Sequence, residues 1–150
     1  MTRTCFDKLL TAGYTPNEGQ ESSIMEIVLL IHNALSNTAW LFFLALGLWG
    51  LFRAVRGQPI SGSYLGAAFI GQMIFVIQAI LGGLLWLADG SGSMQRPGIH
   101  LLYGIFALVF LPFIYFSVLR GDDSNRSQWV MAFTTLFLFG IALRAITTAV

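Results

Sequence analysis

The sequence contains a single cysteine, Cys5, among its 150 residues. One cysteine excludes a disulfide within the chain and any metal cluster held by cysteines of this chain alone. The Cys-x-x-Cys-His pattern of covalent haem attachment is also missing. Cys5 is therefore interpreted as a free thiol.

Charged side chains are scarce as well. Asp, Glu, Lys and Arg make up 10% of the residues, and the formal net charge is +1, whereas soluble domains typically have about a quarter charged residues. The small net charge argues against a nucleic-acid-binding surface. The first 23 residues contain no apolar core long enough for a cleavable signal peptide, so none is predicted.

Apolar residues, in contrast, make up 56% of the chain, and the mean hydropathy is +0.74. They form four runs that are each long enough to span a bilayer as a helix: 24–52, 62–88, 98–119 and 128–149. We therefore predict an all-α fold, an integral membrane bundle of four transmembrane helices over residues 23–150. The polar tail 1–22 is expected to lie on the membrane surface or on a partner.

Two local signals refine these helices. Ser23-Ile24-Met25-Glu26 has the spacing of a capping box, which predicts the start of the first helix. Pro97 suits the first turn of the third helix, and Pro112 predicts a kink in its middle.

The arginines of the short connections predict the orientation in the membrane. Arg53 and Arg56 follow the first apolar run, Arg120 and Arg126 follow the third, and only Arg96 lies in the connection between the second and third. The first and third connections are therefore expected in the cytoplasm, with both termini on the outer side of a bacterial plasma membrane.

Each of the two histidines, His32 and His100, lies within a predicted helix. Each has small residues at i+4 and i+7 on its own helical face: Ser36 and Ala39, and Gly104 and Ala107. Small residues beneath an imidazole leave room for a flat group.

The two histidines are also predicted to lie at the same depth. His32 is 21 residues before Arg53, and His100 is 20 residues before Arg120. At about 1.5 Å per residue both separations are roughly 30 Å, one hydrocarbon thickness. Because the first and third helices run in the same direction, the histidines can face each other across the bundle near the outer leaflet.

A histidine inside a membrane segment is by default a functional hypothesis. Two facing imidazoles form the axial ligand set of a six-coordinate haem b. Arg144 and Arg96, both near the outer end, are predicted to neutralise its propionates. Two alternatives stay open: histidines that only hydrogen-bond between helices, and ligation of another tetrapyrrole, such as the magnesium of a chlorophyll.

Two glycines lie in the second predicted helix, which comes before the helix that contains His100. Gly82 and Gly83 lie about six residues before the outer end of helix 62–88, near the level of the histidines. They are predicted either to let the helices pack closely or to accommodate the edge of a tetrapyrrole ring.

The run Gln78-Ala-Ile-Leu-Gly-Gly83, a polar loop, and Pro97-Gly-Ile-His100-Leu-Leu together resemble a segment of haem A synthases. The likeness covers about 55 residues, and His32 matches the family's first ligand by position only. It implies a half-bundle with one haem-ligating histidine on each of two parallel helices. Two features of the family are absent here: Leu29 stands where it has a glutamate, three residues before the first histidine, and its outer-loop cysteine pair is missing. The likeness therefore extends to holding haem rather than to oxidising its methyl group.

Three functions follow as hypotheses. The first is a small cytochrome b-like protein that transfers electrons, without being an enzyme itself, in a respiratory or photosynthetic complex. The second is a non-catalytic accessory subunit with no cofactor or with a histidine-ligated chlorophyll. Its predicted seam toward other membrane subunits or a second copy is formed by Gly47 and Gly50 with Trp40 and Trp49. Membrane lipid is the other expected partner. The third is a haem-modifying enzyme.

Overall fold

The computed structural model describes residues 16–89 and 96–149. Over these residues it is all-helical, as the sequence predicts, and four of its helices are long and apolar enough to cross a membrane. The elements are α2 (Pro16–Val55), α3 (Gly62–Asp89), α4 (Pro97–Phe113), the π-helical turn η1 (Ile114–Val118) and α5 (Asn125–Ala149).

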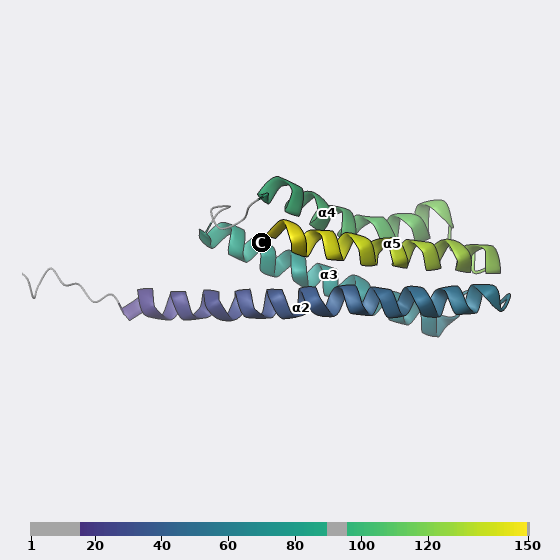
Figure 1. The fold of residues 1–150 in the computed structure, drawn as a ribbon, viewed down its shortest axis with the longest axis horizontal. Helices are drawn as coiled ribbons and strands as arrows, with labels where there is room; N and C mark the ends of the chain where they lie inside the picture. Colours follow the sequence, from purple (N-terminus) through teal and green to yellow (C-terminus); the bar gives the residue numbers. More distant parts are fainter. Residues whose placement is uncertain (1–15, 90–95, 150) are drawn as a thin grey trace, which may run out of the picture.

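α2 begins earlier than the sequence analysis predicted. It starts at Pro16, a residue that suits the first turn of a helix, and it extends beyond the other helices at one end (Figure 1). The predicted capping box is wrong: Ser23 lies inside the helix, and its hydroxyl donates to the Gln20 carbonyl at 2.9 Å. Of the predicted tail, residues 16–22 belong to α2, and residues 1–15 lie outside the described part of the chain.

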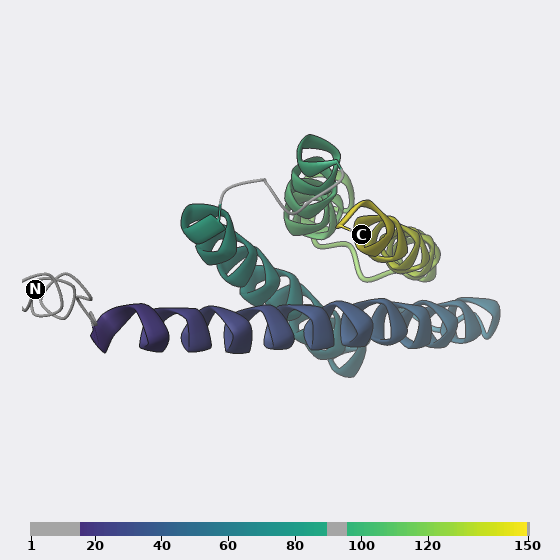
Figure 2. The ribbon, with the colours of Figure 1, turned by 60° about the vertical axis from the view of Figure 1, so that its left-hand side comes forward.

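The four helices form a closed arrangement in which each packs against two others. α2 packs against α3 and α5, and α4 packs against the same two helices. Within the described residues α2 and α4 do not pack directly against each other, so they lie on a diagonal of the bundle (Figures 1 and 2). The two helices that contain the histidines therefore face each other across its interior.

The apolar core occupies only one half of the bundle, toward the connections α2–α3 and η1–α5. Its fully buried side chains include Phe43, Tyr64, Met131 and Leu138. Phe43 stacks on Phe75 of α3 with ring centroids 4.6 Å apart. Interdigitated packing of this kind holds membrane helices together, because lipid is as apolar as the side chains themselves.

Two glycines of α2 face inward and allow close helix packing. A Cβ atom at Gly47 would lie 2.6 Å from the Leu136 side chain, and one at Gly50 would overlap the Tyr64 ring. The partner-facing seam predicted at these glycines is therefore wrong, because α5 and α3 already cover them. Trp49 contacts Tyr64 edge to face and stays partly exposed.

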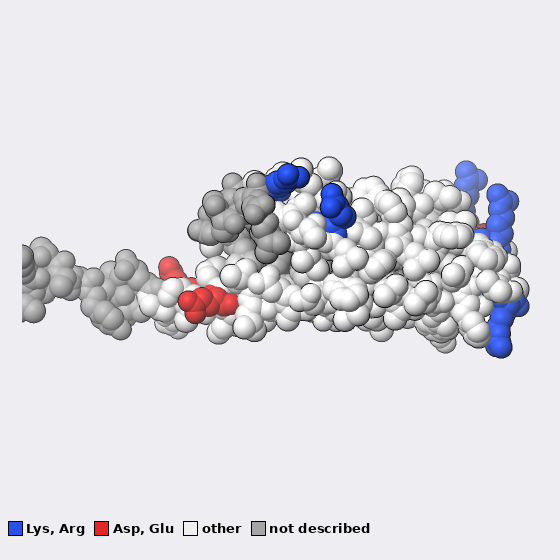
Figure 3. Space-filling view, in the orientation of Figure 1, with Lys and Arg blue, Asp and Glu red and all other residues white. Residues whose placement is uncertain are grey.

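Hydrogen bonds join the two connections at the core end. The Asn125 side chain donates to the Ala54 and Gln58 carbonyls at 3.0 and 2.9 Å. The Ile60 amide donates to the Asp123 carbonyl at 2.8 Å. The arginines of both connections therefore gather at this end of the molecule (Figure 3).

Pro112 lies one residue before the end of α4, and the helical run continues beyond it as the π-helical turn η1. A proline has no amide hydrogen, so the carbonyl four residues earlier, at Leu108, loses its helical donor. The Gln72 side chain of α3 replaces that donor, with its amide nitrogen 2.7 Å from the Leu108 oxygen.

The other half of the bundle has no comparable core. No residue is buried in the segments 19–38, 76–88, 96–106 and 143–147. Apart from Thr148, which is buried near the end of α5, the last buried side chains before this open half are the alanines Ala39, Ala107 and Ala142. Two of them, Ala39 and Ala107, are the i+7 residues of the histidines, so both imidazoles lie just above the edge of the core.

Candidate functional site

The structure brings the two histidines together. The ring centroids of His32 on α2 and His100 on α4 are 6.4 Å apart, and the ring planes are inclined by 55°. The rings lie close because the two helices are diagonal in the bundle and the two residues lie at the same level. The sequence analysis predicted this proximity from the helical rise and the common direction of the two helices.

His100 is held in a defined orientation by α5. Its Nδ1 atom lies 2.9 Å from the Ala145 carbonyl oxygen, and the Thr148 hydroxyl lies 3.5 Å away. A carbonyl oxygen only accepts hydrogen bonds, so Nδ1 has the proton and donates it. The lone pair of the neutral ring is therefore on Nε2, the state in which a histidine ligates a metal.

His32 is bounded by α3, and its hydrogen bonding is weaker than that of His100. Its Nδ1 atom is buried and makes no hydrogen bond of ordinary geometry with the described residues, while the Gln78 backbone carbonyl of α3 lies close enough to accept a weak hydrogen bond from the ring. A Cβ atom at Gly82 would lie 3.3 Å from Cε1 of His32. The absence of a side chain at Gly82 thus leaves the space that the imidazole occupies.

A polar pair lies one turn below His32. The Ser36 hydroxyl donates to the His32 carbonyl at 2.9 Å and accepts a hydrogen bond from the Gln78 side-chain amide. The Gln78 oxygen Oε1 is buried and has no hydrogen-bond partner. On the α2–α3 side of the site, Gln78 Oε1 is therefore a buried acceptor whose hydrogen-bonding capacity is unused within the described residues.

The other predicted site residues make no hydrogen bond to either histidine in the described part of the chain. A Cβ atom at Gly83 or Gly104 would meet nothing within 4 Å, so both face open space. Arg96 is the exposed N-cap of α4. Arg144 is exposed on α5, one residue before the carbonyl that holds His100.

The spacing of the rings suits two ligands on one metal ion. With metal–nitrogen bonds of about 2.1 Å and ring nitrogens about 1.1 Å from their centroid, linear ligation by two imidazoles separates the centroids by about 6.4 Å. The described residues contain no group of three or more His, Cys, Asp or Glu side chains suited to a metal. A tetrapyrrole supplies four nitrogens itself, so the protein needs to provide only the two axial ligands.

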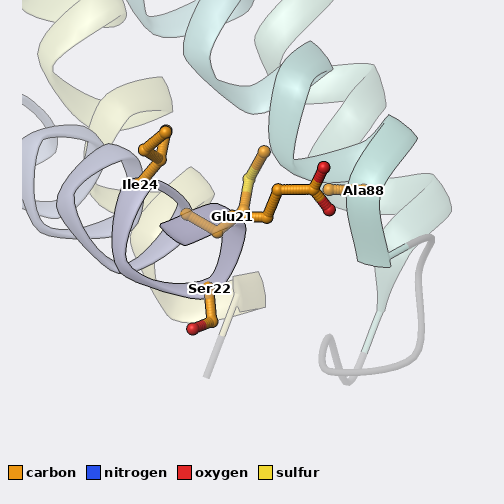
Figure 4. A pocket seen from close by; sticks show the side chains of 5 residues that line it. Glu21, Ser22, Ile24 and Ala88 are labelled. Atoms are coloured by element: carbon orange, nitrogen blue, oxygen red, sulfur yellow. The ribbon is translucent and has the colours of Figure 1, made fainter. Parts of the chain in front are cut away.

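A cavity of about 580 Å³ lies beyond the histidines, between the N-terminal part of α2 and the C-terminal end of α3. Glu21, Ser22, Ile24 and Met25 line it from α2, and Ala88 lines it from α3. Figure 4 shows the Glu21 side chain extending from α2 toward Ala88. Met25 is seven residues before His32, which is about 10 Å along the helix.

Three residues that contact or flank the histidines were missed as site residues: Gln78, Ala145 and Thr148. Gln78 has a detectable signal, because it is four residues before Gly82 and thus on the same face of its helix. Ala145 acts through its backbone carbonyl, which no sequence pattern marks. Thr148 has no spacing relation to His100 that would have indicated the contact.

No protein-family model matches the chain, and neither a curated protein nor a solved structure matches it.

Proposed function

We propose that this chain is an integral membrane protein that holds a haem between His32 and His100 for electron transfer. The observation that carries the proposal is the 6.4 Å separation of the two ring centroids, which equals the spacing for two imidazoles on one metal. The orientation of His100, with Nδ1 bonded to a carbonyl and Nε2 available, supports the same ligation.

The surroundings of the histidines support a planar cofactor. Gly104, four residues after His100 on the same helical face, has nothing within 4 Å of a Cβ position. The buried core on α2 and α4 ends at Ala39 and Ala107, seven residues after the histidines. In this proposal Arg144 and Arg96 lie on the side of the propionates and partly neutralise them. When bound, the haem accepts and releases one electron. The protein's own residues hold it, orient it and surround it with apolar side chains.

The alternative of haem oxidation receives less support from the site. Leu29, at the position of the synthase family's glutamate, has 47% of its surface exposed. The nearest carboxylate on the same helix, Glu26, is six residues before His32, which is about 9 Å along the axis. Because no described carboxylate of α2 is closer to His32 along the helix, electron transfer is the simpler function.

The test is extraction of pigment and metal from the purified full-length protein. We expect one haem per chain, and we expect that His32→Ala and His100→Ala each lose most of it while remaining folded by circular dichroism. Thr135→Val, in the buried core away from the site, is the control and should keep its haem. Chlorophyll in the extract would show that the cofactor is a magnesium tetrapyrrole and not haem. A protein without any pigment would overturn the proposal.

In the proposed setting the protein lies in a bacterial plasma membrane among other respiratory or photosynthetic subunits or a second copy of itself. We propose such partners because a one-electron carrier needs an electron donor and an electron acceptor. Native mass spectrometry after gentle extraction tests this: partner subunits or a dimer are expected, and a lone monomer would contradict it.

A further inference from the structure

Arginine side chains gather at the end of the bundle that contains the connections α2–α3 and η1–α5 (Figure 3). Two of them, Arg53 and Arg56, are exposed at the end of α2, and the connection α2–α3 contains no acidic residue. The acidic residues of this end, Asp122 and Asp123, belong to the other connection, which has one arginine in it and one just after it. The Asp122 carboxylate already accepts hydrogen bonds from two serine hydroxyls, both at 2.6 Å. The α2 side of this end is therefore positively charged, without an acidic residue in its own connection.

Local contacts hold both guanidinium groups of α2 in place. Nη2 of Arg53 donates to the Pro59 carbonyl at 2.8 Å. Cζ of Arg56 lies over the Phe52 ring, 4.5 Å from its centroid. A guanidinium uses its flat face for such a contact, whereas its five N–H donors lie in its plane and stay available. Arg56 is therefore oriented in advance to donate to the oxygens of an anion.

Nearer the centre of the span, the same face of α2 is aromatic. Trp49, Phe52 and Arg56 are spaced i, i+3 and i+7, so they lie on one side of the helix. Trp49 and Phe52 have 39% and 54% of their surface exposed, and Trp49 contacts Tyr64 of α3 edge to face. Aromatic rings of this kind lie at the level of the lipid headgroups. From hydrocarbon to water, this face is thus first aromatic and then cationic, in the same direction as a phospholipid runs from its ester groups to its phosphate.

We propose that this face of α2 binds an anionic phospholipid of the cytoplasmic leaflet. Arg56 and Arg53 bind its phosphate, since arginine suits phosphate oxygens with two parallel N–H donors, and Trp49 and Phe52 contact its ester region. The anionic lipids of that leaflet attract basic residues next to a membrane span. The proposal needs a membrane location but no haem, so a chain without any cofactor would leave it standing.

The experiment titrates purified full-length protein with phosphatidylglycerol or phosphatidylcholine and counts the bound lipids by native mass spectrometry. We expect the wild type to bind phosphatidylglycerol in preference. Arg56→Gln should weaken this binding by about fivefold, the scale for one basic residue at an anionic surface. Arg56→Lys should restore only part of it, because an ammonium lacks the planar donors. Phe52→Leu keeps the charge but removes the ring that orients it, so its binding should be intermediate.

Arg126→Gln is the matched control, because it removes the same charge at the same end, from α5 rather than from α2. It should keep most of the binding, and an equal loss in Arg56→Gln and Arg126→Gln would replace the site by a general attraction and overturn the proposal. Equal binding of the two lipids by the wild type would overturn it as well. Displacement of the lipid by excess inorganic phosphate would make this a site for free phosphate and contradict the role of the aromatic residues. The pigment content of the same samples tests the proposed function separately.

Discussion

At the scale of single residues, Gly82 sets the position of His32. A methyl group there would lie 3.3 Å from the imidazole, closer than most Cβ contacts, so Gly82→Ala should displace the ring. We expect a haem content lower by about tenfold, the scale of losing a ligand's support. Haem-to-protein ratio is the measurement.

Gly83→Ala is the matched control, because the next residue on the same helix faces open space. It should retain its haem and fold at least as stably, since alanine is the better helix former by roughly 1 kcal/mol. Equal haem loss in both variants would show that the helix, not the contact with His32, is responsible.

Arg144 provides a second prediction at this scale. A cation near the haem favours the reduced, less positive form, so Arg144→Gln should lower the midpoint potential. Because the side chain is exposed, the shift should be on the order of tens of millivolts. Arg56→Gln, at the opposite end of the bundle, is the comparison in a redox titration. Identical potentials in the two variants would mean that Arg144 only extends toward water.

At the scale of helices, the Gln72 side chain stabilises the α3–α4 interface by bonding the carbonyl that Pro112 leaves free. Gln72→Leu should leave that carbonyl without a donor and cost about 1–3 kcal/mol. Pro112→Ala restores a helical donor, so the same glutamine substitution should then cost much less. A double-mutant cycle of unfolding free energies in detergent measures this coupling. Additive effects would contradict the replacement of one donor by the other.

The beginning of α5 is predicted to respond to acid. The Asp122 carboxylate accepts hydrogen bonds from the Ser124 and Ser127 hydroxyls, which lower its pKa below the ordinary value. Because the pKa is lower in the folded state, the ionised Asp122 carboxylate stabilises the folded protein at neutral pH. This stabilisation is lost as the pH falls from about 3.8, the ordinary pKa of an aspartate, through the lower pKa of Asp122 in the folded state.

Asp122→Asn removes the titrating group. The melting temperature of the variant should change less than that of the wild type between pH 6 and pH 3, roughly the range over which an aspartate titrates. The Asp123→Asn variant is the control, because Asp123 contributes its backbone carbonyl rather than its carboxylate. A wild-type acid response retained in Asp122→Asn would refute the role of this carboxylate.

At the scale of the whole molecule, the arginines of the connections α2–α3 and η1–α5 favour a cytoplasmic location for the end of the bundle that contains these two connections. The prediction is tested in a Cys5→Ser background with a membrane-impermeant maleimide on intact cells. A cysteine at Ser91 should be labelled, and one at Asp123 should be labelled only after the cells are opened. The reverse pattern would invert the orientation.

Much of this architecture could be predicted from the sequence, because hydropathy and helical rise act over long segments. They located four helices and placed His32 and His100 at one level. Details that depend on tertiary contact could not be predicted. Gly47 suits a seam between proteins as well as one within the bundle, and only the position of Leu136 decides between them. The partner of His100 is a backbone carbonyl, which every residue has.

The central claim is that His32 and His100 ligate one metal from opposite sides of a tetrapyrrole. Optical and electron paramagnetic resonance spectra of the oxidised protein test it most directly. We expect a low-spin, six-coordinate haem in the wild type, with the pair of imidazoles inclined as in the structure, at 55°. His32→Ala should give a five-coordinate, high-spin spectrum or lose its haem, and His100→Ala should do the same. A low-spin spectrum that persists unchanged in both variants would contradict the claim.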